Sequence, residues 1–215
     1  MVKEYFYKKT GLYIDWDQLK KLPEIDTLVD IGVGDIGSPM LYERFPKQKL
    51  ILVDPLDEAE HYAKNNLSER DFVYFKTAVG KEKSNLEINI ENEINRSTLM
   101  EVKEVNFEGL PIEKRLVEIN TLDFLLKDLP NLNKIGIKID TEGYELDVIL
   151  GSREILKNTK FVIAEVRHNH ESFEKCYKLH QFMNAMQNNA FQLSMILTAK
   201  PLIADLCFQP IKDLK

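Results

Sequence analysis

The chain has 215 residues, a formal net charge of −6 and 44% hydrophobic residues. This length suits one domain, or one domain with a small extension, and lets it bury about two-thirds of its unfolded surface without disulfide or metal staples. The acidic balance argues against nucleic acid as a partner, because phosphate binding needs a clustered basic surface.

Membrane and secretion patterns are not found in the sequence. No run of about 18 apolar residues occurs, so we expect no transmembrane helix. Residues 1–10 are charged and aromatic and lack the apolar stretch of a signal peptide. Cys176 and Cys207 have neither a Cys-x-x-Cys nor a metal-binding spacing and are interpreted as buried thiols. We therefore expect a cytoplasmic protein without a membrane partner.

Apolar runs alternate with helical stretches in the first half of the chain. Residues 1–25 are predicted to form a helical lead-in, with Trp16, Leu19 and Leu22 on one face, and residues 26–215 to form the main domain. Strands are predicted at residues 27–31, 49–53 and 72–76, and helices at residues 39–45 and 58–67. This alternation favours a parallel sheet that is covered on both faces.

The second half begins less regularly. Residues 86–90 alternate apolar and polar side chains, which predicts an exposed strand, and residues 95–104 are predicted to form a loop. Further strands are predicted at residues 116–119, 135–139 and 160–166, and helical segments at residues 121–126, 146–157 and 172–188. Thr121 is the expected N-cap of the first of these helices. Two consecutive strands at residues 191–197 and 202–208 indicate a terminal antiparallel hairpin.

Three of the nine glycines lie close together between a predicted strand and a predicted helix, at Gly32, Gly34 and Gly37. Glycines permit a tight turn there, and a Cβ would block the close approach of a nucleotide. The spacing matches G-x-G-x-x-G, and Asp54 at the end of the next strand is placed to accept hydrogen bonds from ribose hydroxyls. The loop predicts a nucleotide cofactor, either NAD or S-adenosylmethionine; a tight turn without a ligand is the alternative.

Two acidic residues favour S-adenosylmethionine. Asp30 precedes the first glycine by two positions, as methyltransferase loops prefer. Asp35 lies inside the loop, where it would repel a pyrophosphate but not a cationic sulfonium that also carries an amino group.

The most informative segment spans residues 133–151 and reads NKIGIKIDTEGYELDVILG. It resembles the signature of the FkbM family of methyltransferases, in which a strand ends in K-I-D-x-E-G and an acidic residue, an apolar run and a glycine follow. The matching residues are Lys138, Ile139, Asp140, Glu142, Gly143, Glu145 and Gly151. The resemblance extends over residues 26–170 and includes residues 30–32, 54–55, 77–80 and 117–125, and Glu165.

The resemblance implies a Rossmann-like α/β methyltransferase fold, with a seven-stranded, mostly parallel sheet, a C-terminal antiparallel hairpin and helices on both faces. It implies S-adenosylmethionine as the cofactor, with Gly32 and Gly34 around its methionine and ribose portions. Asp54 would hold the ribose hydroxyls, and Ala78 would lie near the adenine. Asp30 and Asp140 complete the predicted cofactor-binding residues.

Asp140, Glu142 and His168 are the predicted catalytic residues. Asp140 ends a central strand, and ligands of open α/β sheets bind at the carboxyl ends of the strands. The carboxylates of Asp140 and Glu142 have three candidate roles: binding the methionine amino group, acting as the base, or sharing a divalent cation with Glu165, although the sequence assigns no metal site. Glu142 as a helix cap and His168 as a surface residue are the alternatives.

Lys138 lies inside an apolar strand and must pair with a carboxylate. We interpret it as a structural ion-pair partner of Glu165 or Asp30 rather than as a catalytic amine.

The leading hypothesis is an O-methyltransferase that acts on a hydroxyl of a sugar or small metabolite. A NAD-dependent oxidoreductase is the second hypothesis, and it predicts a parallel strand in place of the terminal hairpin. A non-catalytic Rossmann-like domain is the third. The acceptor, the oligomeric state and the choice between oxygen and nitrogen as the methylated atom stay open.

Overall fold

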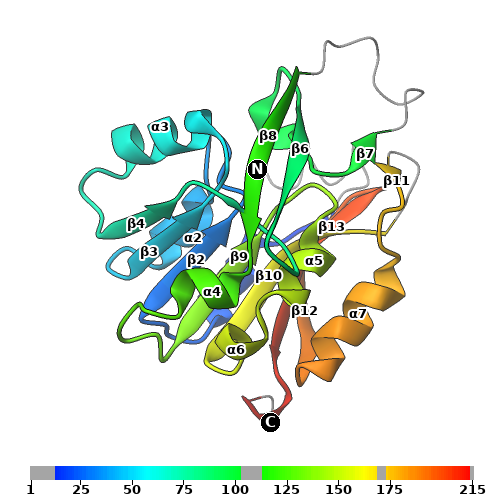
Figure 1. Cartoon of the computed structure of the whole chain (residues 1–215). Helices are drawn as coiled ribbons and strands as arrows, with labels where there is room; N and C mark the ends of the chain where they lie inside the picture. The colour runs from blue at the N-terminus through cyan, green and yellow to red at the C-terminus, as the bar shows by residue number, and fades with distance from the viewer. Residues whose placement is uncertain (1–12, 103–112, 169–172, 214–215) are drawn as a thin grey trace, which may run out of the picture.

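The computed structural model describes residues 13–102, 113–168 and 173–213. Its main sheet has the strand order β1-β12-β13-β10-β9-β2-β3-β4 (Figure 1). These strands are β1 (Tyr13–Ile14), β2 (Thr27–Ile31), β3 (Lys49–Val53), β4 (Phe72–Phe75), β9 (Ile135–Ile139), β10 (Thr159–Arg167), β12 (Phe191–Ala199) and β13 (Ile203–Pro210).

The five strands β4, β3, β2, β9 and β10 are parallel, whereas β13 is antiparallel to β10 and to β12. The predicted seven-stranded sheet with a terminal hairpin is therefore confirmed, and the two-residue β1 adds to its edge through β12. The terminal hairpin contradicts the parallel strand that the oxidoreductase hypothesis predicts.

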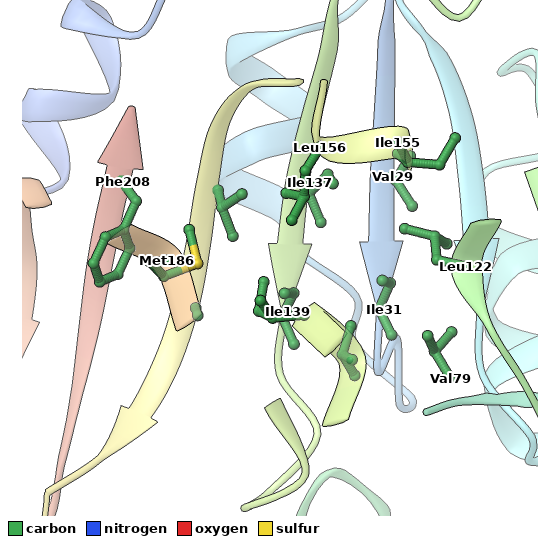
Figure 2. Packing of buried hydrophobic residues seen from close by; sticks show 14 of the residues in the cluster. Val29, Ile31, Val79, Leu122, Ile137, Ile139, Ile155, Leu156, Met186 and Phe208 are labelled. Carbon is green, nitrogen blue, oxygen red and sulfur yellow. The ribbon is translucent and has the colours of Figure 1, made fainter. Parts of the chain in front are cut away.

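Helices cover both faces of the sheet, as predicted. One face packs against α4 (Leu122–Leu126), α5 (Glu145–Leu150), α6 (Arg153–Leu156) and α7 (Leu179–Asn188). Figure 2 shows this packing, in which Ile31 of β2 and Ile139 of β9 lie among side chains from the covering helices. The opposite face packs against η1 (Trp16–Lys21), α2 (Pro39–Arg44) and α3 (Asp57–Asn66). Thr121 Oγ1 accepts a hydrogen bond from Phe124 N, so it is the N-cap of α4.

A smaller sheet is inserted between β4 and α4. It has the order β5-β8-β6, with β5 (Ala78–Val79), β6 (Ser84–Ile90) and β8 (Glu113–Asn120), and β6 and β8 stand beside each other in Figure 1. The predicted loop after β6 contains η2 (Ile94–Arg96) and β7 (Glu101–Val102), and β7 pairs with β11 (Phe173–Glu174). Ile88 and Ala78 of this sheet belong to a third apolar cluster.

Two predicted helices differ from the structure. Residues 1–12 of the predicted lead-in lie outside the described residues. The described part contains strand β1 and a short 3-10 helix, η1, and Leu19 and Leu22 pack into the main core. The boundary between residues 25 and 26 stays a prediction. The predicted helix at residues 172–188 begins only at Leu179. Lys175 has φ +58°, which interrupts a helix, and Phe173 pairs as a strand with Val102.

A short 3-10 turn, η4 (Ile211–Asp213), follows β13. Among the residues that the structure describes, no helix has the length and apolar character needed to cross a membrane.

Candidate active site

The site forms where β2 pairs with β3 on one side and with β9 on the other. At such a switch point of a parallel sheet, the loops that leave the strand ends diverge and open a crevice. The glycine loop follows β2 and Asp140 follows β9, and Asp140 N donates a hydrogen bond to Ile31 O at 2.9 Å. Two segments more than 100 residues apart in sequence thus meet at this edge of the sheet.

The glycine loop needs its glycines because of backbone conformation and crowding. Gly32 has φ +83°, and a Cβ there would lie 1.8 Å from Asp140 O. Gly34 has φ +56°, and its Cβ would lie 2.0 Å from the Asn95 side-chain oxygen. Side chains at these positions would push apart the walls of the crevice.

Asp54 fixes the glycine loop from the end of β3. Its carboxylate accepts hydrogen bonds from Gly34 N at 3.0 Å and from Leu56 N at 2.9 Å. Burial raises the pKa of Asp54 to about 6, although these backbone N–H groups oppose the shift. Each oxygen keeps lone pairs that a ligand hydroxyl can use.

A first cavity opens above these loops. Five of the six predicted cofactor-binding residues line it: Gly32, Gly34, Asp54, Ala78 and Asp140. Sequence reasoning missed other wall residues, including Asn95, Thr141 and Tyr144. Ser97, from the segment after η2, also lines the cavity, and its Oγ is buried without a hydrogen-bond partner among the described residues.

Asp30 lies behind the glycine loop and lines neither of the two cavities at this site. It is fully buried, and its Oδ2 accepts a hydrogen bond from the Tyr42 hydroxyl. Burial raises the pKa of Asp30 to about 6, against the hydrogen bonds from Tyr42 and Ser38. Asp30 therefore contacts Tyr42 of α2 and Ser38 at the end of the glycine loop, and it does not face a ligand in the cavity.

The turn between β9 and α5 is held by Glu145. This buried carboxylate accepts hydrogen bonds from Thr141 N at 3.1 Å, Gly143 N at 2.9 Å and the Tyr177 hydroxyl at 2.7 Å. Within the turn, Glu142 has φ +50° and Gly143 has φ +102°. A non-glycine residue in this region is strained, so the surrounding bonds must hold it there. Glu145, the acidic residue that follows Gly143 in the motif, therefore has a structural role, because it holds this turn in place.

We predict that Glu145→Ala lowers the free energy of unfolding by about 3–5 kcal/mol, because it leaves several buried donors unpaired. Glu145→Gln is the matched control. Its side-chain oxygen still accepts from the two backbone N–H groups, so a loss of about 1 kcal/mol is expected. Urea denaturation of the three proteins measures the difference, and equal losses for both variants would contradict the assignment.

Lys138 has different partners from those predicted. Its Nζ lies 3.1 Å from Asp140 Oδ2 and 3.0 Å from Asp205 Oδ1, whereas the sequence suggested Glu165 or Asp30. The antiparallel pairing of β13 with β10 places Asp205 beside Glu165, and the sequence did not show this neighbour. Burial favours loss of the Lys138 proton, but the nearby carboxylates outweigh it and keep the pKa of Lys138 above its usual range.

Three carboxylates gather in front of these strands. Oxygens of Asp140, Glu142 and Glu165 all lie within 4.8 Å of one another. Each also pairs with a cation: Asp140 with Lys138, Glu142 with Arg167, and Glu165 with Lys200. Burial and the neighbouring Asp140 charge raise the pKa of Glu165 to about 8. The charges of the cluster are thus balanced mainly by side chains of the protein.

Glu142 and His168 line neither of the two cavities. Glu142 is turned toward Arg167 and lines neither cavity. His168 is exposed, and its Nε2 donates a hydrogen bond to Lys200 O at 3.0 Å. The structure brings Asp140 to the cavities and leaves these two candidates beside them, so their catalytic roles stay predictions.

A second cavity adjoins the first. Gly37, Ser38 and Asp140 line both cavities. Trp16 and Glu165 line only the second cavity, on the face of the sheet that η1 and α2 cover. Asp140 therefore stands at the boundary between two adjacent cavities.

Comparisons with known proteins agree with this architecture. The solved structure of methyltransferase FkbM from Methylobacillus flagellatus KT superposes with a TM-score of 0.56 at 14% identity, covering 95% of this chain and 50% of that chain. The chain thus spans about half the length of that protein. A likeness at this identity shows the fold alone.

Two further structures are less similar. Magnesium protoporphyrin IX methyltransferase from Synechocystis PCC 6803, with bound SAM, has a TM-score of 0.48 at 9% identity, covering 91% of this chain and 76% of that chain. A putative S-adenosylmethionine dependent methyltransferase from Listeria monocytogenes has a TM-score of 0.49 at 12% identity, covering 91% of this chain and 97% of that chain. No curated protein matches the sequence.

The family comparison covers most of the chain. Residues 30–193 match the model of the methyltransferase FkbM domain. The matched segment includes the glycine loop, Asp54 and the Asp140 turn, which together form the first cavity. The chain belongs to the FkbM family of methyltransferases.

Proposed function

We propose that this protein transfers a methyl group from S-adenosylmethionine to a hydroxyl group of a sugar or small metabolite. The observation that supports it most is the first cavity, whose walls combine the family's glycine loop with the Asp54 carboxylate and the Asp140 turn. When bound, S-adenosylmethionine supplies an activated methyl group on a cationic sulfur.

The residues of the first cavity fit this cofactor. Asp54 presents a buried carboxylate with free lone pairs, which suits the two hydroxyls of a ribose. Ala78 and Val79 offer an apolar wall for the adenine, next to Ile88 and Leu99. Gly32 and Gly34 leave room for the ligand along the loop, and Asp140 is a candidate partner for the methionine amino group.

Methyl transfer requires a nucleophile aligned with the methyl carbon and the sulfur, so most of the catalytic gain comes from positioning. Asp140 borders both cavities and is therefore the side chain best placed next to the reacting atoms. Its ion pair with Lys138 holds the carboxylate in one orientation. A hydroxyl acceptor also needs a group that takes its proton.

Calorimetric titration with S-adenosylhomocysteine and with NADH tests the proposal. We expect saturable binding of S-adenosylhomocysteine in the micromolar range, about −8 kcal/mol, and none of NADH. Absence of S-adenosylhomocysteine binding at millimolar concentration would overturn the proposed function. Binding without any transfer to hydroxyl acceptors would favour a non-catalytic domain.

A further inference from the structure

The second cavity has no role in the cofactor site, yet it touches that site. It shares Gly37, Ser38 and Asp140 with the first cavity and extends from there toward Trp16 and the β12–β13 hairpin. A molecule in the second cavity would therefore contact one in the first across the Asp140 boundary. This adjacency is what a transfer between two bound molecules requires.

The polar wall of the second cavity is internally balanced. Lys138 is paired with Asp140 and Asp205, and Lys200 lies 3.6 Å from Glu165. Lys138 keeps the pKa of Asp205 below its usual range although burial opposes this, while the pKa of Glu165 is about 8. Each of the two ammonium groups on this wall therefore lies next to at least one carboxyl group.

This charge balance selects the kind of molecule that fits. An anionic acceptor would have to compete with the carboxyl groups of the protein for both ammonium groups. A cationic acceptor would meet Lys138 and Lys200. A neutral acceptor with hydroxyl groups can donate hydrogen bonds to the carboxylates and accept them from the ammonium groups.

The remaining wall is apolar. Trp16, Met40, Leu41 and Ile163 line it. An occupant that has both hydroxyl groups and carbon–hydrogen surface satisfies the polar and the apolar lining residues. A ring or short chain with several hydroxyl groups has this character.

We propose that the second cavity is the methyl-acceptor site and that it takes an uncharged molecule with several hydroxyl groups; this inference rests on the proposed function. In it, Glu165 accepts the proton of the reacting hydroxyl. In this step the acceptor oxygen forms the new bond to the methyl carbon. The carbon–sulfur bond breaks and its electron pair stays on sulfur. The hydroxyl proton passes to the ionised Glu165 carboxylate and leaves to solvent afterwards.

The single tryptophan of the chain provides a direct readout, because Trp16 lines this cavity. The probes are methyl α-D-glucopyranoside, D-glucuronate and D-glucosamine, which differ mainly in charge. Each is titrated at constant ionic strength into protein saturated with S-adenosylhomocysteine, and Trp16 emission is recorded. We expect a saturable change with the neutral probe and affinities at least about tenfold weaker for both charged probes.

Two outcomes overturn the inference: tighter binding of a charged probe, or no saturable change of Trp16 emission with any probe. The proposed function is tested separately, since S-adenosylhomocysteine binding is measured by calorimetry before the probes are added. If that binding is present and the probe response is absent, only the acceptor site is wrong.

A matched pair of substitutions locates the binding independently of fluorescence. Met40 lines only the second cavity and Ile36 only the first, and both side chains are exposed, so tryptophan can replace them without disturbing the core. Met40→Trp is expected to abolish saturation transfer to methyl α-D-glucopyranoside in NMR spectra and to leave S-adenosylhomocysteine affinity within about twofold. Ile36→Trp is expected to weaken S-adenosylhomocysteine binding instead. The reverse pattern would refute the assignment of the cavities.

Discussion

Replacing Asp54 with asparagine is expected to weaken S-adenosylhomocysteine binding by about 10- to 100-fold at about pH 7.5, since hydrogen bonds to a charged group contribute roughly 1.5–3 kcal/mol. The carboxylate accepts from Gly34 N and Leu56 N and still has lone pairs for two ribose hydroxyls. An asparagine offers one acceptor oxygen and turns an N–H group toward one of these donors. Isothermal titration calorimetry of both proteins measures the loss.

The pH dependence gives this prediction a second readout. Burial raises the pKa of Asp54 from 3.8 to about 6 in the protein without ligand, and ribose hydroxyls donate best to its ionised form. Binding therefore releases a proton at low pH. Affinity should rise as the pH rises toward 6 and become constant above it, with a fall of about tenfold per pH unit well below the pKa. The Asp54→Asn variant should lack this dependence.

Asp57→Asn is the matched control, because it removes one carboxylate three residues away. Asp57 is exposed, pairs with Lys76 and lines neither cavity. The Asp57→Asn variant should bind S-adenosylhomocysteine with the same affinity as the unchanged protein at each pH. A flat pH profile for the unchanged protein, or equal losses in both variants, would show that Asp54 does not hold the ligand.

The parallel part of the fold could be predicted because its signals are local. Strands β2, β3 and β9 are short apolar runs whose bounds the sequence indicates without error, since buried strands between turn residues are distinctive. The helix predicted from residue 172 was wrong at its start because tertiary contacts decide that segment. Phe173 pairs with β7, and the Tyr177 hydroxyl bonds to Glu145. Side-chain periodicity alone does not contain these contacts.

The cofactor side of the site was more predictable than the acceptor side. The spacing of Gly32, Gly34 and Asp54 is predictable because a tight turn beside a nucleotide requires glycines and a ribose requires a hydrogen-bond acceptor. All three residues line the first cavity. The second cavity collects residues from five separate segments, and Lys200 and Asp205 come from a hairpin whose neighbours depend on strand order. One signal was present: Asp205 is the single charged residue within the apolar run of β13, and a buried carboxylate there needs a partner.

Replacing Glu165 with glutamine is expected to lower turnover by about 100- to 10,000-fold, the range that general base catalysis contributes. The substitution preserves the size of the side chain and its hydrogen-bonding capacity, so Trp16 titrations should show unchanged binding of methyl α-D-glucopyranoside. In the unchanged protein, turnover should rise with pH as Glu165 ionises near its pKa of about 8. The variant should show no such rise. The rate of S-adenosylhomocysteine release measures turnover of both proteins at each pH. The acceptor in this assay is the neutral glycoside that supports the fastest reaction.

Stability against pH separates this role from a structural one. Glu165 has a pKa of about 8 in the folded protein against 4.5 ordinarily, so the folded state holds an extra proton between these values. Its favourable contribution is present below pH 4.5 and is lost as the pH rises to about 8. Glu165→Gln should remove the part of the decline between about pH 6 and pH 8 in urea denaturation, because Asp30 and Asp54 contribute only up to their pKa of about 6. Glu154→Gln, an exposed change on α6, should retain it. If the Glu165→Gln protein has normal turnover and an unchanged stability profile, another group accepts the proton of the acceptor hydroxyl. Asp140 would then be the remaining candidate, because its carboxylate lines both cavities.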